Sequence, residues 1–288
     1  MEGCVVAAHG RHYVVELAGG RLLPCFTRGK RSDVACGDRV DIGASGVDQG
    51  VIEAIQPRTS LLYRSDATRQ KLIAANVDQV IIVVATEPGF SDELVTRALL
   101  AAESEEIAPL IVLNKCDLGD RLPAARAQLA VFARLGYRVV ELSARDHADD
   151  LRPLLAGRTS VLVGQSGMGK STLVNALVPE AQAATREISA ALDTGKHTTT
   201  HAALYHLDAG SHLIDSPGLQ EFGLRHLDRQ DIEASFPEFR PWLGQCRFRD
   251  CHHDREPDCA LRAALAAGAI DARRFVVYRR IVGTPRGD

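Results

Sequence analysis

The sequence predicts an α/β protein of three parts: a small N-terminal β-barrel, a central domain of alternating strands and helices, and a small, mostly helical C-terminal domain that binds a metal. Three observations support this division. Short strand-like segments separated by glycines fill about the first 60 residues, strand and helix patterns alternate from about residue 70 to 223, and cysteines and histidines cluster after residue 245. A chain of 288 residues is long enough for two or three domains. We expect them at residues 1–62, 63–223 and 224–288.

The N-terminal region carries β-branched residues in short segments bounded by glycine or charged turns. The clearest segments are VVAAHGRHYVVEL, LLPCFTRGK, GDRVDIG and GVIEAI. About five short strands in so short a region favour a closed barrel of the OB-fold type. Arg28, Lys30 and Arg31 follow one of these strands and have two interpretations, a surface that faces nucleic acid or a solvated basic turn.

The central region alternates apolar runs with helical periodicity. DQVIIVVAT is a nearly continuous apolar run, which is typical of a strand buried on both faces of a sheet. SDELVTRALLAAES follows, with Ser91 as the expected N-cap of a helix. The alternation continues through strands in APLIVLN, YRVVELSA and TSVLV and through helices at 123–135 and in KSTLVNALV. It predicts a mostly parallel sheet.

The composition is ordinary for a soluble globular protein, with 45% hydrophobic and 25% charged residues. A formal net charge of −3 excludes a polycation, so any nucleic-acid binding must depend on local patches. The N-terminus lacks the pattern of a secretory signal, and no run approaches the ~18 apolar residues of a membrane helix. We expect a cytoplasmic monomer that does not associate with membranes.

The segment GQSGMGKS fits the phosphate-loop pattern G-x-x-x-x-G-K-[ST] at every fixed position. It follows a predicted strand and opens a predicted helix, as the pattern requires. Glycines let backbone N–H groups converge on phosphates, and the helix N-terminus adds positive partial charge. We expect Lys170 to reach the outer phosphates and Ser171 to offer its hydroxyl to Mg²⁺. The residues expected at the phosphates are Gly164, Gln165, Ser166, Gly167, Met168, Gly169, Lys170, Ser171 and Thr172.

The segment NKCD, which follows the apolar strand PLIVL, indicates that the base is guanine. The Asp117 carboxylate can accept hydrogen bonds from N1–H and from the exocyclic amine of guanine. Adenine lacks this pair of donors, and a buried carboxylate without partners is costly. Lys115 can cover the purine face with its methylenes, and Asn114 can tie loops together. Cys116 is interpreted as a packing residue at the same loop.

Two further loops follow predicted strands. Ser143 and Ala144 follow VVEL, so we expect the Ala144 N–H to reach the guanine carbonyl. The segment DSPG follows SHLI and fits the pattern DxxG. Its Asp215 would hold Mg²⁺ through water, and the Gly218 N–H would contact the γ-phosphate.

These loops occur along the chain in a rotated order: base loop, Ser-Ala loop, phosphate loop, threonine loop, DxxG. In the familiar GTPase order the phosphate loop comes first. Rotation preserves the arrangement in space where the parent's termini lie close together. The sequence therefore predicts one guanine-nucleotide site in a circularly permuted P-loop GTPase domain. DxxG then leads directly into the C-terminal region, so we expect nucleotide state to be coupled to that region.

The polar stretch GKHTTTH precedes the DxxG strand and supplies two more candidates. We expect Thr199 to bind Mg²⁺ when the third phosphate is present, with Thr198 as the alternative. Leu219 occupies the position after DxxG where many GTPases carry a water-orienting glutamine, and Gln220 is one step too far. His197 is the candidate to position water, and a solvated loop histidine is the alternative. Slow turnover, accelerated by a partner that orders this loop, is expected.

The C-terminal cysteines have the spacing of a closed, structural Zn²⁺ site, because three thiolates and one imidazole complete a tetrahedron. The thiolates would come from Cys246, Cys251 and Cys259, and the imidazole from His252 or His253. Unrelated free cysteines are the alternative. The next predicted helix carries four arginines that either grip RNA phosphates or are merely solvated: Arg273, Arg274, Arg279 and Arg280.

The combination of these features resembles the family of GTPases that depend on the small ribosomal subunit, RsgA/YjeQ, also called EngC. The likeness covers nearly the whole chain and includes NVDQV, GKHTTTH, DSPG and CRFRDCHHDREPDCA. The resemblance implies a bacterial cytoplasmic GTPase whose OB-fold docks on the 30S subunit and its rRNA. It implies a role late in subunit maturation, with GTP hydrolysis to GDP stimulated by the subunit.

The resemblance also implies roles for particular residues. The family's zinc ligands correspond to Cys246, Cys251, His253 and Cys259, which favours His253 over its neighbour. The family's catalytic histidine in the switch loop corresponds to His197. One structural Zn²⁺, and Mg²⁺ bound with GTP, are the cofactors implied.

Three other functions are alternatives to this interpretation of the sequence. The first is a GTP-regulated switch that binds a protein or another RNA, which ribosome-stimulated hydrolysis would distinguish. The second is a zinc-dependent nucleic-acid module with a vestigial nucleotide site, against which the intact phosphate loop argues. The third is an ATP-using kinase, which Asp117 and Ala144 disfavour.

Overall fold

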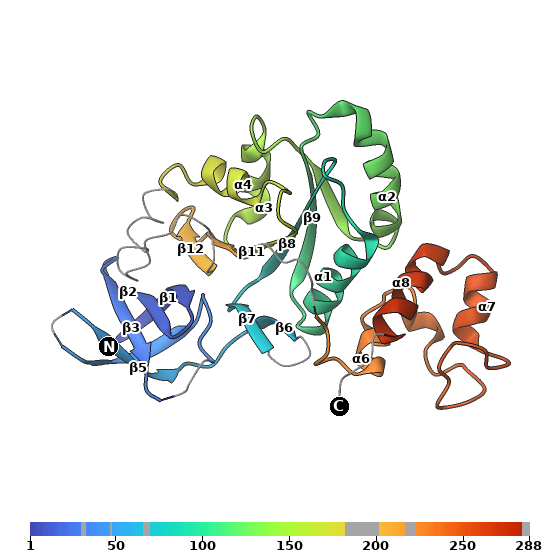
Figure 1. The fold of residues 1–288 in the computed structure, drawn as a ribbon, viewed down its shortest axis with the longest axis horizontal. Helices are drawn as coiled ribbons and strands as arrows, with labels where there is room; N and C mark the ends of the chain where they lie inside the picture. The colour runs from blue at the N-terminus through green and yellow to red at the C-terminus, as the bar shows by residue number, and fades with distance from the viewer. Residues whose placement is uncertain (30–32, 47, 66–69, 182–201, 217–222, 284–288) are drawn as a thin grey trace.

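The computed structural model describes residues 1–29, 33–46, 48–65, 70–181, 202–216 and 223–283. The molecule is elongated, with the N-terminal strands at one end, a central sheet in the middle and the C-terminal helices at the other end (Figure 1). Among the described residues, no helix combines the length and the apolar character needed to cross a bilayer.

The first five strands close into a barrel. β1 pairs with both β2 and β4, and the circuit is completed by the pairs β2–β3, β3–β5 and β5–β4. An apolar cluster that includes Val5, Tyr13, Val40 and Ile52 fills the interior. The expected N-terminal β-barrel is confirmed. Its strands are β1 (Glu2–His9), β2 (His12–Leu17), β3 (Leu22–Thr27), β4 (Arg39–Ala44) and β5 (Gly50–Ile55).

The central sheet has the order β10-β9-β8-β11-β13-β12. All neighbouring strands are parallel except β12, which runs antiparallel to β13. Every residue of β8 is buried, as its continuous apolar run predicts. The mostly parallel sheet is confirmed. Its strands are β8 (Gln79–Ala85), β9 (Ala108–Asn114), β10 (Arg138–Glu141), β11 (Thr159–Val163), β12 (Ala202–His206) and β13 (His212–Asp215).

Helices pack against this sheet where the periodicity predicts them. Ser91 caps the first helix, because its hydroxyl oxygen accepts from the backbone N–H groups of Glu93 and Leu94. α1 packs on β8 and β9, α2 on β10 and α4 on β13. The elements are α1 (Asp92–Ser104), η1 (Gly119–Arg121), α2 (Leu122–Arg134), η2 (Ala148–Leu151), α3 (Arg152–Leu155) and α4 (Lys170–Leu177).

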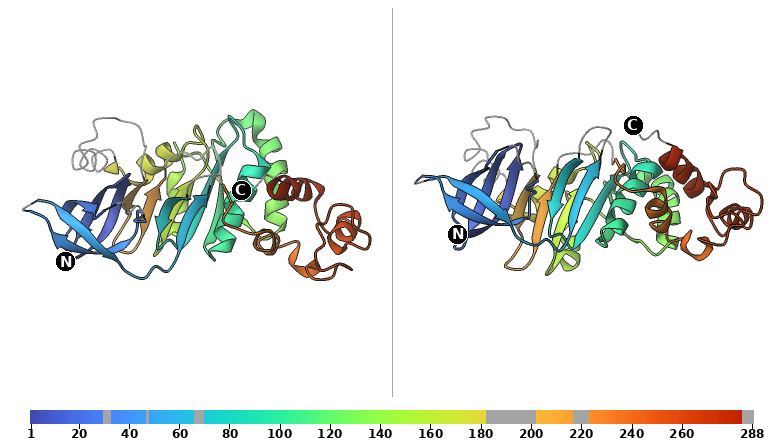
Figure 2. Two further views of the ribbon diagram at one scale, coloured as in Figure 1. Left: turned by 60° about the horizontal axis from the view of Figure 1, so that its bottom comes forward. Right: turned by 90° about the horizontal axis from the view of Figure 1, so that it is seen from below.

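The barrel and the central sheet are hydrogen-bonded to each other. β1 pairs with β12, where Ala7 lies opposite Ala203, and Figure 2 shows the strands of the barrel continuing into the central sheet. A hairpin of β6 (Leu61–Ser65) and β7 (Gln70–Ala75) lies beside this junction, so the boundary expected after residue 62 falls inside β6. Gly37 contacts the end of this hairpin. It has a φ of +92°, and a Cβ there would collide with the carbonyl oxygen of Ala75, so only glycine fits at this contact.

The C-terminal region contains α6 (Arg229–Ala234), η3 (Arg240–Trp242), α7 (Ala260–Ala266) and α8 (Ala272–Gly283). The interpretation of α8 as a basic RNA-gripping face is wrong for Arg274, which is 1% exposed. Its guanidinium donates to Glu238 at 2.7 Å and to the Thr96 hydroxyl of α1 at 2.7 Å. Arg273 and Arg279 are ion-paired to Asp92 and Asp254, respectively. Arg274 therefore packs within the molecule, whereas Arg273 and Arg279 form ion pairs from partly exposed positions.

Candidate functional site

The phosphate-loop segment joins the end of β11 to the start of α4. Gly169 has a φ of +91°, and a Cβ there would collide with the side-chain nitrogen of Asn114. Only glycine fits, because the left-handed backbone and the close approach of another loop both exclude a side chain. Lys170 is 7% exposed, and its ammonium donates to the carbonyl oxygens of Gly164 at 2.7 Å and Gln165 at 3.0 Å. The loop therefore curls around its own lysine.

Lys170 and Asp215 are opposite charges buried near each other. Burial lowers the pKa of Lys170 below its ordinary value, and the negative charge of Asp215 partly offsets this. Burial raises the pKa of Asp215 to about 6, against the opposing effect of the Lys170 charge. The Oδ1 atom of Asp215 is buried and has no hydrogen-bond partner within the described residues. A buried carboxylate oxygen without a partner suits the water shell of a bound cation.

Asn114, 1% exposed, connects three loops. Its amide nitrogen donates to the carbonyl oxygen of Met168 at 2.8 Å, in the phosphate-loop segment. Its carbonyl oxygen accepts from the backbone N–H of Ala144 at 2.9 Å. The expectation that Asn114 ties loops together is confirmed. The Ala144 N–H, expected at the guanine carbonyl, is here donated to Asn114.

The neighbouring lysine of NKCD is also fixed in place. Lys115 has a φ of +61°, its carbonyl oxygen accepts from the Thr86 hydroxyl at 2.9 Å, and its ammonium donates to the carbonyl oxygen of Glu87 at 2.8 Å. The side chain therefore extends across the loop that follows β8. Cys116 is half-buried and packs against the core, as expected.

One cavity of about 540 Å³ lies between these loops. Four of the predicted residues do not line it: Cys116, Gly164, Gln165 and Met168. Met168 is 1% exposed and belongs to the core, so its side chain points away from the cavity. The predicted residues that line it are Asn114, Lys115, Asp117, Ser143, Ala144, Ser166, Gly167, Gly169, Lys170, Ser171, Thr172 and Asp215.

The cavity wall contains three residues that sequence reasoning missed, namely Leu118, Arg145 and Ser216. Each directly follows a residue that was predicted, in NKCD-Leu, Ser-Ala-Arg and Asp-Ser. Extending NKCD and Ser-Ala by one residue would have found Leu118 and Arg145, and Ser216 occupies a variable position inside DSPG. Thr199, His197 and Gly218 lie outside the described residues.

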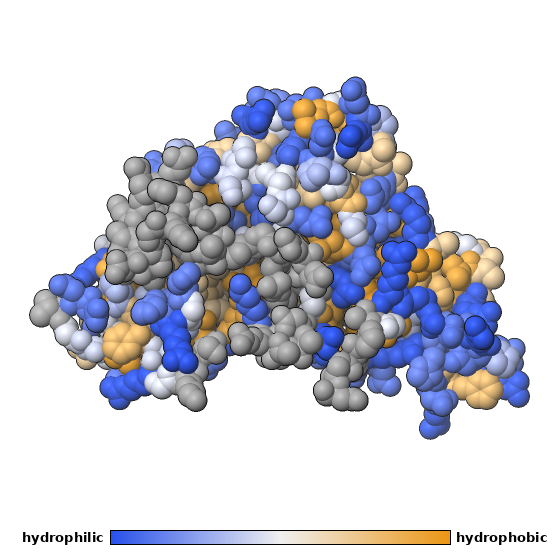
Figure 3. Space-filling model, in the orientation of Figure 1, coloured by the Kyte–Doolittle hydropathy of each residue, from blue (hydrophilic) through white to orange (hydrophobic). Residues whose placement is uncertain are grey.

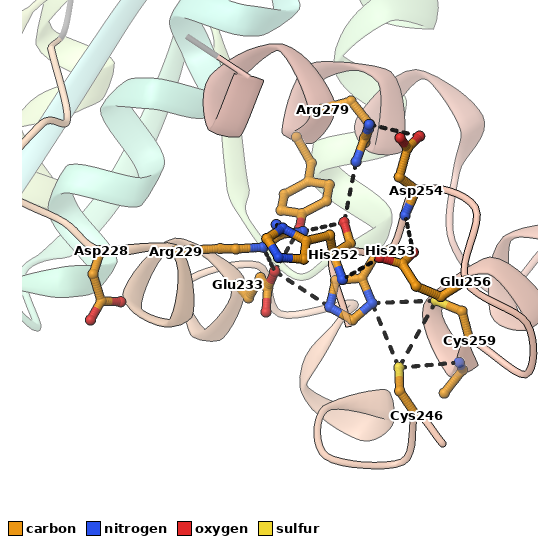
Figure 4. Close-up of polar contacts among 12 residues, drawn as sticks. Asp228, Arg229, Glu233, Cys246, His252, His253, Asp254, Glu256, Cys259 and Arg279 are labelled. Atoms are coloured by element: carbon orange, nitrogen blue, oxygen red, sulfur yellow. Dashed lines mark hydrogen bonds and ion pairs between the residues drawn. The ribbon is translucent and has the colours of Figure 1, made fainter. Parts of the chain in front are cut away.

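A second group of side chains lies in the C-terminal region and could hold a metal ion. The ligand atoms of Cys246, Cys251, His253 and Cys259 all lie within 4.8 Å of one another. The Nδ1 atom of His253 faces the sulfurs of Cys246 at 3.6 Å and Cys259 at 3.3 Å (Figure 4). His252, the alternative left open by spacing, is exposed and lies beside Arg229 instead.

The other ring nitrogen of His253 faces Glu233 of α6, with Nε2 3.4 Å from Oε1. The same carboxylate accepts from Arg229 at 2.7 Å and from the Tyr278 hydroxyl at 2.5 Å. Burial acts to raise the pKa of Glu233, but these hydrogen bonds outweigh it and hold the pKa below its ordinary value. A carboxylate behind a histidine fixes the ring so that Nδ1 is free to bind a metal.

Comparison with known proteins identifies the family. The family model described as "RsgA GTPase" matches residues 55–225. A relative from Bordetella pertussis (strain Tohama I), named small ribosomal subunit biogenesis GTPase RsgA, is 59% identical over 98% of this chain and 95% of its own. The chain belongs to the RsgA GTPase family. A relative of the same name from Burkholderia pseudomallei (strain K96243) is 57% identical over 98% of this chain and 91% of its own.

Solved structures of RsgA-like proteins agree with the fold. YjeQ from Thermotoga maritima superimposes with a TM-score of 0.73 at 31% identity and covers 99% of both chains. YloQ, described as a circularly permuted GTPase, gives a TM-score of 0.69 at 27% identity over 98% of this chain and 93% of its own. The predicted fold class, a circularly permuted P-loop GTPase domain between a β-barrel and a helical region with a cysteine cluster, is confirmed.

Proposed function

We propose that this protein is a GTPase that binds the small (30S) ribosomal subunit, acts late in its maturation, and hydrolyses GTP to GDP and phosphate faster when bound to the subunit. The observation that carries the proposal is the meeting of NKCD and the phosphate-loop segment at one cavity, although they occur in rotated order. The shared name of relatives at 57% and 59% identity supports the ribosomal partner.

Three features support phosphate binding in this cavity. Lys170 places a buried positive charge at its floor, and its pKa is lowered chiefly because it lacks solvent. The first N–H groups of α4 face the same loop, and a helix N-terminus favours anions. Gly169 leaves room where any side chain would collide. The negative charge of bound phosphates would offset the cost of burying the Lys170 ammonium, so nucleotide binding would also stabilise the folded loop.

Asp117 would select guanine, because it can accept from two donors that adenine does not offer together. Lys115, held across the loop by Glu87, would cover the purine face with its methylenes. Asn114 would keep this base loop in register with the phosphate-loop segment through its bond to Met168.

Ser171 and Asp215, together with Thr199, would hold Mg²⁺. The ion supplies positive charge to the β- and γ-phosphate oxygens. The partnerless Oδ1 of Asp215 supports this role, since a hydrated cation would give it the partners it lacks among the described residues. The Gly218 N–H would contact the γ-phosphate. His197 would orient the attacking water, because Leu219 at the usual glutamine position cannot.

The C-terminal cluster would bind one structural Zn²⁺, since three thiolates and an imidazole leave no open position for catalytic water. We also propose that the barrel contacts rRNA, that the protein is a cytoplasmic monomer, and that its domains divide near residues 62 and 223.

Nucleotide state would reach the metal region through α6. This helix begins at Arg229, after a capping box at Asp228. Its Glu233 faces His253 of the metal cluster, and its Arg229 donates to the carbonyl oxygen of the adjacent His252. A shift of Gly218 would therefore be transmitted to His253. Hydrogen exchange of residues 223–283 should differ between the GDP-bound protein and the protein bound to a GTP analogue. Identical hydrogen exchange in the two nucleotide states would contradict this coupling.

The decisive experiment measures GTP hydrolysis with and without purified 30S subunits, with Lys170→Ala as the inactive variant. Arg121→Ala serves as the matched control, because Arg121 is an exposed cation outside the cavity. Stimulation of wild type and of the control, but not of Lys170→Ala, is expected. A rate of GTP hydrolysis that does not change when 30S subunits are added would instead favour a GTP-regulated switch with another partner.

A further inference from the structure

Phe248 is an aromatic side chain directed into solvent from the metal-binding loop. It is 42% exposed, and the other large exposed hydrophobic side chains of the described chain are not aromatic. Its sequence neighbours are charged: Arg247, Arg249 and Asp250. Figure 3 shows the C-terminal end of the molecule, at lower right, as a largely hydrophilic surface with isolated apolar spots. Among the described residues, the sequence neighbours of the ring are charged and exposed, so they do not surround it with apolar surface.

The backbone around Phe248 is ordered by contacts on both sides. The Cys251 N–H donates to the Phe248 carbonyl oxygen at 3.3 Å, which closes a four-residue turn. The Arg247 N–H donates to the carbonyl oxygen of Asp258 at 3.3 Å. The turn lies between Cys246 and Cys251, two members of the metal cluster. A ring presented from such a turn loses little conformational entropy when it meets a partner.

A guanidinium already stacks beside the ring. The central carbon of the Arg247 guanidinium lies 5.5 Å from the centre of the Phe248 ring, and Asp258 holds that guanidinium at 3.1 Å. Arg249 is exposed, and no hydrogen bond or ion pair of its side chain is found within the described residues. An exposed aromatic ring beside one guanidinium, with a second arginine next to it in the sequence, matches the surfaces on which unpaired nucleobases stack, with cations nearby for the phosphates.

We propose that Phe248 stacks on an unpaired base of RNA in the small ribosomal subunit, with Arg249 contacting the adjoining phosphate. The inference rests on the proposed function, because it assigns a contact to the partner named there. RNA is favoured over protein because every base offers a π-face, whereas a protein partner would need apolar surface around the ring. The contact belongs to the metal-binding loop, and neither Phe248 nor Arg249 lines the nucleotide cavity.

The test compares the binding of full-length variants to purified 30S subunits in the presence of a GTP analogue. Phe248→Leu keeps an apolar side chain but removes the π-face, and it should weaken binding about 10-fold. Phe248→Trp should bind as well as wild type or better. Val276→Ala is the matched control, because Val276 is an exposed apolar residue on α8. Metal content and GDP affinity should be unchanged in all three variants.

A photoreactive phenylalanine analogue at position 248 identifies the partner class. A crosslink to rRNA is expected, and a crosslink to a ribosomal protein would overturn the inference. Equal subunit binding by Phe248→Leu and wild type would also overturn it, while leaving the proposed function intact. Failure of the wild-type protein to bind subunits would instead remove the proposed function, and this inference with it.

Discussion

Replacement of Arg274 by alanine should loosen the contact between the C-terminal region and the central domain. The Arg274 side chain is buried between the rings of Phe132 and Phe236, with the guanidinium carbon 5.3 and 4.6 Å from their centres. It donates to Glu238 at 2.7 Å and to Thr96 on α1. One side chain thus connects α8, the segment before η3 and two elements of the central domain.

The magnitude follows from what the substitution leaves behind. Glu238 is 9% exposed, and without Arg274 its carboxylate would be a buried charge without its cation. Removing one member of a buried ion pair costs about 3–5 kcal/mol. We expect Arg274→Ala to lower the free energy of opening of α8 by about that amount. Arg249→Ala, at an exposed position, should change it by less than about 0.5 kcal/mol.

The assay is hydrogen exchange of α8 and α1, which reports local opening even where the whole chain does not unfold as one unit. The double variant Arg274→Met with Glu238→Leu should recover most of the loss, because it removes both buried charges together. Equal protection in Arg274→Ala and Arg249→Ala would refute the assignment of Arg274 as the connecting residue.

Three further outcomes are expected. Gly169→Ala should abolish GDP binding in equilibrium dialysis, because its Cβ would displace Asn114, whereas Gly119→Ala, with open space around it, should bind normally. Asp215→Asn should stabilise the ligand-free protein by about 3 kcal/mol at pH 7, because the carboxyl pKa is raised from its ordinary value of 3.8 to about 6, and by nothing near pH 3. Because the carboxyl pKa is raised to about 6 in the folded state, the free energy of unfolding of the wild-type protein should fall as the pH rises from about 4 through 6. Denaturation curves that show no such pH dependence would contradict this. Cys259→Ser should release metal and remove exchange protection from α7 while leaving GDP affinity unchanged, and metal analysis with hydrogen exchange checks both parts.

Much of the site could be predicted because the residues that carry its chemistry occur in short contiguous motifs. The phosphate-loop segment, NKCD and the cysteine spacing each require particular residue types within a few positions. The cavity therefore contains most of the residues that the motifs name. Leu118 and Arg145 were missed because they follow the motifs, and Ser216 because it occupies a variable position of DxxG, so none of them has a spacing rule of its own.

The helix α8 shows where sequence reasoning failed. Arg274 occupies the stripe formed with Val277, Tyr278 and Ile281, at helical spacings of three, four and seven, and all four residues are buried. From sequence alone, an arginine is expected to face solvent unless its buried partner is known. That partner, Glu238, is 36 positions away, and the stacking ring of Phe132 comes from another domain.

The sequence by itself determined the barrel, the parallel sheet, the guanine-nucleotide motifs and the three cysteines of the metal cluster, because periodicity and short motifs are local properties of the chain. The tertiary structure placed His253, and not His252, beside those cysteines. The tertiary structure alone decided that β1 pairs with β12 and joins the barrel to the sheet. It also decided that Asn114 joins three loops and that Arg274 is buried. Each of these depends on residues distant in sequence that meet only when the chain is folded, since hydrogen bonding and burial are fixed by position in space.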